Sequence, residues 1–178
     1  SGMRKAVEST RGPRKKRRGP PPDIIRHLVQ EDLLSCLFFC FSRRECEARA
    51  RTARRRRLVN KHEREQLLAE FDRLCELYEV DPRDQASELR ELAAQGIFYH
   101  HAGLLPIYKE IVERLFTTGL VKLLFTTETF AVGVNMPARS VVFSALRKFD
   151  GVGFSYLPTL SYYQMAGRAG RQGMDDEG

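Results

Sequence analysis

Two arginines in the C-terminal part of the sequence have the spacing of a phosphate-binding pair. Arg168 and Arg171 stand three residues apart within the stretch Tyr162–Gly173, so on a helix both guanidinium groups lie on one face. Gly167 and Gly170 leave that face open to a large anion, although each costs a helix about 1 kcal/mol relative to alanine. Because guanidinium donates paired hydrogen bonds and keeps its charge, the pair predicts contact with phosphate. An Arg/Gly surface turn is the alternative on these residues alone.

Hydrolysis of a nucleoside triphosphate needs more than two arginines. It needs a cradle for the phosphates, a carboxylate for Mg²⁺, a residue that orients water, and positive charge on the transition state. The sequence offers a candidate only for the last, because it contains no Gly-x-x-x-x-Gly-Lys-Ser/Thr loop. We therefore expect Arg168 and Arg171 to act on a nucleotide held by another domain, and we expect this chain alone to be inactive.

The elements that position these residues alternate along the chain. Short apolar runs predict strands at Ser35–Phe41, Gly96–His101, Val121–Phe125 and Ser140–Ala145. Helices are predicted at Ile24–Gln30 (capped by Asp23), throughout 43–95 with one break at Asp81-Pro82, at Ile107–Phe116 (ended by Gly119), and from Pro158. Within 43–95, a core-facing stripe is predicted from the helical spacing of Leu67, Leu68, Phe71, Leu74, Leu77 and Tyr78. This alternation predicts an α/β domain with a mostly parallel central sheet flanked by helices, and a helical insertion after the first strand.

Polar or small residues follow three of the predicted strands. They are Ser42 and Arg43 after the first strand, His101 and Gly103 after the second, and Thr127 and Thr129 after the third. Because ligands of such sheets bind beyond the carboxyl ends of the strands, these residues predict one site for a phosphate-rich ligand. For the two threonines, plain strand-end positions are an equal alternative.

No metal site is predicted. His100 and His101 are adjacent, so on leaving a strand their rings point to opposite faces. The cysteines have no metal-ligand or disulfide-type spacing, and we interpret them as reduced thiols of an intracellular protein; they are Cys36, Cys40, Cys46 and Cys75. No apolar run approaches the roughly 18 residues of a membrane span, so no membrane partner is expected, and the expected state is a monomer.

The net charge of +7 lies entirely at the N-terminal end. Residues 1–22 hold eight of the 30 Lys and Arg residues and one of the 23 Asp and Glu residues, so residues 23–178 are balanced. We predict that residues 1–22 form a disordered tail or linker, with 1–3 as a cloning remnant, and that 23–178 form the domain. The arginine-rich segment Arg49–Arg57 is interpreted as a solvated helix face, with a nucleic-acid stripe as the alternative.

Four segments of the sequence resemble motifs IV, IVa, V and VI of superfamily-2 helicases. These segments are Leu37–Cys46, Tyr99–Pro106, Thr127–Arg139 and Gln164–Gly173. Their order and spacing resemble the second RecA-like domain of the DExH group that includes the superkiller and exosome-associated RNA helicases. Lys148-Phe149-Asp150-Gly151, before the last motif, favours that RNA branch.

The resemblance implies roles for the candidate residues. Gln164, Arg168 and Arg171 would face the ATP phosphates, with the two arginines as arginine fingers. Gly133 and Asn135 would couple the nucleotide to the nucleic-acid track. The sugar–phosphate path would be lined by Ser42, Arg43, His101, Gly103, Thr127 and Thr129. The implied cofactor is ATP with Mg²⁺, held mainly by a first RecA-like domain, and the implied partners are that domain, single-stranded RNA and an RNA-degradation complex.

Departures and two alternatives accompany this resemblance. The long basic helical stretch 43–95 matches the family pattern only loosely. The last motif reads Arg171-Gln172-Gly173 where a second adjacent arginine is usual, which puts one phosphate contact in doubt. The first alternative is the same domain of a DNA-repair helicase. The second is a non-enzymatic nucleic-acid-binding module driven by the basic tail.

Overall fold

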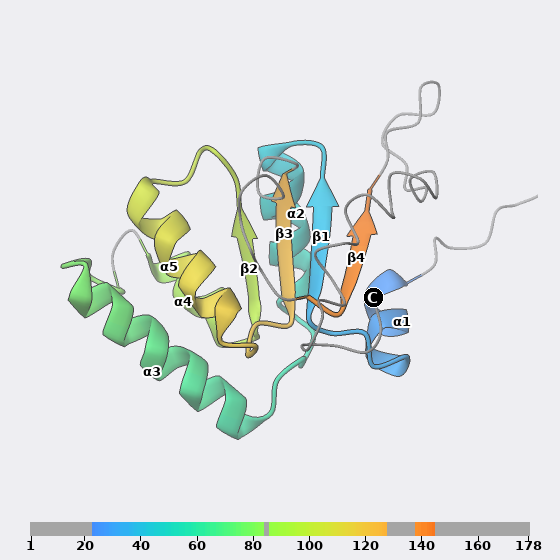
Figure 1. Ribbon diagram of the computed structural model, residues 1–178, viewed down its shortest axis with the longest axis horizontal. Helices are drawn as coiled ribbons and strands as arrows, with labels where there is room; N and C mark the ends of the chain where they lie inside the picture. The colour runs from blue at the N-terminus through green and yellow to red at the C-terminus, as the bar shows by residue number, and fades with distance from the viewer. Residues whose placement is uncertain (1–22, 84–85, 128–137, 145–178) are drawn as a thin grey trace, which may run out of the picture.

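In the described part of the chain, four parallel strands form a central sheet. The computed structural model describes residues 23–83, 86–127 and 138–144 (Figure 1). In the order β2-β3-β1-β4, the strands are β2 (Ile97–His100), β3 (Leu123–Thr127), β1 (Cys36–Cys40) and β4 (Ser140–Phe143). The predicted α/β architecture is therefore confirmed. The third strand begins two residues later than predicted and continues to Thr127.

Helices cover both faces of this sheet. They are α1 (Ile24–Gln30), α2 (Arg43–Ala53), α3 (Lys61–Leu77), α4 (Ser87–Ala93) and α5 (Pro106–Thr117). In Figure 1, α2 runs behind the strands, α4 and α5 lie beside β2, and α3 lies outermost. Side chains place α2 and α5 on opposite faces, because His101 contacts α2 whereas the adjacent His100 contacts α5.

The insertion between β1 and β2 has one more break than the sequence analysis predicts. Besides the break near Asp81-Pro82, the chain leaves helical geometry after α2 and re-enters it at Lys61, directly after the N-cap Asn60. Asn60 accepts a hydrogen bond from the Glu63 N–H at 2.8 Å, and the Glu63 carboxylate accepts one from the Asn60 N–H at 3.1 Å. This reciprocal capping box starts a new helix, so the prediction of a single break was wrong.

Aromatic side chains fill the core on both sides of the sheet. Phe38 and Phe125 pack at 5.1 Å between ring centroids, and Phe71 of α3 stacks on Phe98 of β2 at 6.3 Å. The predicted stripe along α3 is buried at Leu67, Phe71 and Leu74. The prediction that Leu77 faces the core was wrong: this residue lies in the last turn of α3 and is 56% exposed.

Local signals fix the ends of the elements around the site. Asp23 caps α1 as predicted, accepting a hydrogen bond from the Arg26 N–H at 3.1 Å. Gly119 follows the end of α5 with φ of +78°, the left-handed conformation that ends helices. The helix predicted from Pro158 lies outside the described residues.

Candidate nucleic-acid interface

Five of the predicted site residues lie in the described part of the chain: Ser42, Arg43, His101, Gly103 and Thr127. The remaining six lie outside it: Thr129, Gly133, Asn135, Gln164, Arg168 and Arg171. The five described residues all stand at the carboxyl ends of β1, β2 and β3 or directly after them.

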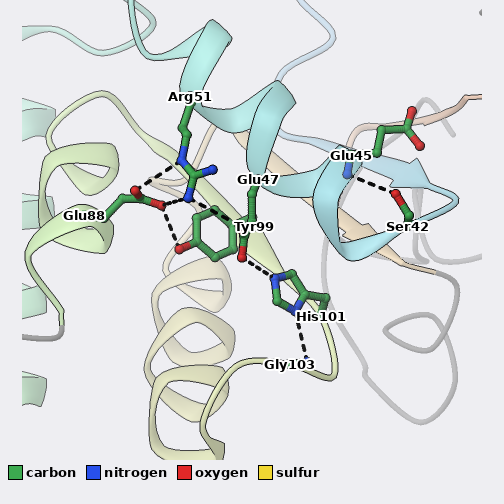
Figure 2. Close-up of polar contacts among 8 residues, drawn as sticks. All are labelled: Ser42, Glu45, Glu47, Arg51, Glu88, Tyr99, His101 and Gly103. Carbon is green, nitrogen blue, oxygen red and sulfur yellow. Dashed lines mark hydrogen bonds and ion pairs between the residues drawn. The ribbon is translucent and has the colours of Figure 1, made fainter. Parts of the chain in front are cut away.

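Ser42 is the N-cap of α2. Its Oγ accepts a hydrogen bond from the Glu45 N–H at 3.0 Å (Figure 2). The Glu45 carboxylate accepts from the Phe41 N–H at 2.8 Å and from Arg49 Nε at 3.1 Å. Ser42 thus turns the chain from β1 into α2, and the exposed Arg43 becomes the first helical residue. The positive end of the α2 dipole adds to the charge of Arg43 there.

Gly103 allows the loop after β2 to lie against α2. An added Cβ at Gly103 would lie 3.0 Å from Nδ1 and Cε1 of His101 and 3.3 Å from Cδ of Arg43. Arg43 and Gly103 are sixty positions apart in sequence, and the parallel sheet brings them into contact range. Thr127 is half-buried at the end of β3, in register with Cys40 at the end of β1.

His101 is placed differently from its neighbours because its ring is buried, with only 4% of the residue exposed. Nδ1 accepts a hydrogen bond from the Gly103 N–H at 3.0 Å, and Nε2 lies 2.9 Å from Oε1 of Glu47. The imidazole therefore shapes the loop from inside. This differs from the expected place of His101 among the residues that line the nucleic-acid path.

Four polar residues beside this loop form a network with His101, although none of them is among the candidate site residues predicted from the sequence: Glu47, Arg51, Glu88 and Tyr99 (Figure 2). The i, i+4 spacing of Glu47 and Arg51 predicts a helix-surface ion pair, and this pair is present at 3.3 Å. Burial alone would raise the pKa of Glu88, but hydrogen bonds from Arg51 and Tyr99 outweigh it and lower that pKa.

His100 faces the opposite side of the sheet, as the adjacency of the two histidines predicts. Its Nε2 lies 2.9 Å from Oε1 of Glu113 on α5. Burial lowers the pKa of His100 to about 4 and raises the pKa of Glu113. The contact is therefore a hydrogen bond between a neutral imidazole and a carboxylate at neutral pH.

The described residues include no arrangement of three or more His, Cys, Asp or Glu side chains suited to a metal ion. In the same ranges, no helix combines the length and the apolarity that crossing a membrane requires. The four cysteines are buried free thiols, and burial raises the pKa of Cys36 to about 12 and that of Cys75 to about 11.

Comparison with known families decides what kind of domain presents this edge. The family of helicase conserved C-terminal domains matches residues 56–173. The chain belongs to this family. This match and the similar proteins described below confirm the predicted resemblance to the second RecA-like domain of superfamily-2 DExH helicases.

Similar proteins are much longer than this chain. It is 46% identical to the DExH-box ATP-dependent RNA helicase DExH11 of Arabidopsis thaliana over 87% of its own length and 12% of the relative's. It is 42% identical to the antiviral helicase SKI2 of Saccharomyces cerevisiae, over 88% of this chain and 12% of that protein. It is 38% identical to the human exosome RNA helicase MTR4, over 99% of this chain and 18% of that protein. The chain thus spans between about an eighth and a fifth of these helicases.

Proposed function

We propose that this chain is the second RecA-like domain of an ATP-dependent RNA helicase, working on single-stranded RNA. The observation that carries the proposal is the gathering of Arg43, Gly103 and Thr127 at the carboxyl edge of the sheet in a helicase C-terminal domain. An exposed cation at a helix N-terminus, next to the exposed backbone of Gly103, suits a phosphodiester backbone. The names of the relatives favour RNA over DNA.

The proposed nucleic-acid path uses two kinds of residue. Ser42, Arg43, Gly103, Thr127 and Thr129 would contact the sugar–phosphate backbone. His101 would support the path from below, because its ring is buried under the loop. Backbone contacts of this kind fix a strand in place without reading its sequence.

The proposed nucleotide site is shared with another domain. Gln164, Arg168 and Arg171 would face the phosphates of ATP and Mg²⁺ bound mainly to a first RecA-like domain, and Gly133 and Asn135 would couple that site to the RNA. This assignment is supported by the spacing of Arg168 and Arg171 and by the family match over residues 56–173. Arginines supplied across a domain interface accelerate phosphoryl transfer by about 10³–10⁵ in other systems.

The proposed setting is intracellular, because the four cysteines are buried free thiols. An RNA-degradation complex is the proposed partner, since one relative is named as an exosome RNA helicase. Closure of two RecA-like domains on ATP, and reopening after hydrolysis, would step the protein along the strand.

The test is ATP turnover by the full-length protein without nucleic acid, with single-stranded RNA and with single-stranded DNA, beside the 178-residue chain. We expect stimulation by RNA, no turnover by the 178-residue chain, and a loss of about 10³-fold or more in the full-length Arg171→Ala variant. Unchanged stimulation in that variant contradicts the arginine-finger role. Stimulation by DNA alone moves the function to DNA repair. No turnover at all leaves a binding module, which would lose binding when residues 1–22 are removed.

A further inference from the structure

A polar network beneath the candidate interface connects two helices to the loop after β2 (Figure 2). We infer that Glu47 of α2 is a positioning residue that orients His101 and thereby holds the loop of residues 101–105 in place for RNA. The inference rests on the proposed function, because it deepens the RNA-binding part of that function. Glu47 lies in none of the four helicase motif segments.

The first step is the orientation of the His101 ring. A backbone N–H can only donate, so Nδ1, which accepts from Gly103 at 3.0 Å, carries no hydrogen. The ring hydrogen is therefore on Nε2, where it is donated to Oε1 of Glu47 at 2.9 Å. The ring also stacks on Tyr99, with 5.6 Å between centroids and an angle of 6°. Both nitrogens and one face of the imidazole are thus fixed.

The second step is the support of Glu47 itself. Arg51 Nη2 lies 3.3 Å from Oε2 of Glu47 and 3.0 Å from Oε1 of Glu88, and Arg51 Nε donates to Oε2 of Glu88 at 3.2 Å. Tyr99 donates its hydroxyl hydrogen to Oε1 of Glu88 at 2.9 Å. The guanidinium of Arg51 is thus shared by the carboxylates of Glu47 and Glu88. Because Arg51 contacts Oε2 of Glu47, the other oxygen, Oε1, accepts from His101. The network joins α4, α2 and β2 below the loop.

The third step leads from the ring to the molecular surface. Because Gly103 has no side chain, its backbone lies close to the His101 ring on one side and to the stem of Arg43 on the other. Loss of the Glu47 carboxylate would leave the buried Nε2–H without its acceptor, which is costly enough to reorient the ring. Reorientation removes the acceptor of the Gly103 N–H and loosens the loop against Arg43. This polar network contains none of the residues proposed for the nucleotide site, so we expect the effect to fall on RNA affinity.

The experiment uses the full-length protein with Glu47→Ala, Glu47→Gln and the control Glu70→Ala, which removes an ion pair with Arg73 on α3. RNA-stimulated ATPase gives the RNA concentration for half-maximal stimulation and the turnover at saturating RNA. Hydrogen exchange followed by mass spectrometry reports on the backbone amides of residues 101–105.

For Glu47→Ala we expect the half-maximal RNA concentration to rise about tenfold, the scale of one lost charge-assisted hydrogen bond. Turnover at saturating RNA is expected to stay within about twofold, and loop exchange to accelerate. Glu47→Gln keeps an oxygen that accepts from Nε2 and is expected to restore most of both readouts. Glu70→Ala is expected to behave as wild type.

Each contrary result has a separate meaning. Unchanged RNA dependence and unchanged loop exchange in Glu47→Ala overturn the positioning role. An equal loss in the Ala and Gln variants also overturns it, because a purely structural ion pair with Arg51 would give that pattern. A wild-type protein that hydrolyses ATP without any response to RNA overturns the proposed function, and loop exchange then decides the claim about Glu47 by itself.

Discussion

His100 and His101 are neighbours in the sequence, yet their rings bind carboxylates on opposite faces of the sheet. His100 lies 2.9 Å from Glu113 of α5, and His101 lies 2.9 Å from Glu47 of α2. The alternation of side chains at the end of β2 produces this division. One histidine thus belongs to the support of the loop, and the other belongs to the packing of α5 on the sheet.

His100 gives the protein a pH-dependent stability. Its pKa falls from 6.5 to about 4 on folding, so between these values the unfolded chain binds a proton that the folded chain does not. The contribution of His100 to the free energy of unfolding therefore falls by about 3 kcal/mol as pH falls from 6.5 to 4. The raised pKa of Glu113 acts in the opposite direction.

His100→Gln isolates the contribution of His100 to the pH dependence of stability, because glutamine still donates to Glu113 but does not titrate. Urea unfolding between pH 7 and pH 4 is expected to show a shallower loss of stability in the variant than in the wild type. Parallel curves for the two proteins would contradict the assignment.

Gly96 and Gly119 both have positive φ, +74° and +78°, but only one is crowded. An added Cβ at Gly96 would lie 2.6 Å from Cγ1 of Val59, whereas one at Gly119 would meet nothing within 4 Å. Gly119→Ala is expected to cost about 1 kcal/mol for the left-handed backbone alone. Gly96→Ala is expected to cost about 1–3 kcal/mol more through overpacking. Urea midpoints of the two variants measure the difference, and equal midpoints would show that Val59 yields without cost.

Gly103→Ala tests the close approach of the loop to Arg43. The new methyl group would press on the His101 ring at 3.0 Å and on Arg43 Cδ at 3.3 Å. We expect the RNA concentration for half-maximal ATPase to rise several-fold, with a stability loss of about 1 kcal/mol. Gly119→Ala, which lies in open space away from this loop, is the matched control. Wild-type RNA dependence in Gly103→Ala would place the RNA elsewhere.

The sequence predicts the sheet well because each strand is a continuous apolar run closed by polar residues. Asn60 and Glu63 show a signal that is present locally, since an Asn-x-x-Glu capping box can be read without a structure. Leu77 shows the limit of periodicity, because spacing gives the face of a helix but not where its partner surface ends. The Glu47–His101 contact joins residues 54 positions apart, so it depends on the packing of α2 on β2 and has no local signal.

Arg43 and Arg55 stand at opposite ends of α2. Substituting each of them distinguishes an RNA path along the carboxyl edge of the sheet from a nucleic-acid stripe along Arg49–Arg57. Arg43 is exposed at the N-terminal end, beside the Gly103 loop, and Arg55 is exposed just beyond the C-terminal end. If the RNA path follows the carboxyl edge of the sheet, Arg43→Ala weakens RNA binding for all sequences and lowers the salt slope of log Kd by about 1.

Arg55→Ala removes the same charge at the far end of the helix and is expected to leave both quantities unchanged. Titrations of the full-length variants with labelled single-stranded RNA between 50 and 200 mM salt, about the range where phosphate contacts dominate, measure this. A comparable loss in the two variants would instead support the nucleic-acid stripe along Arg49–Arg57, because only a path along the whole helix would sense both ends.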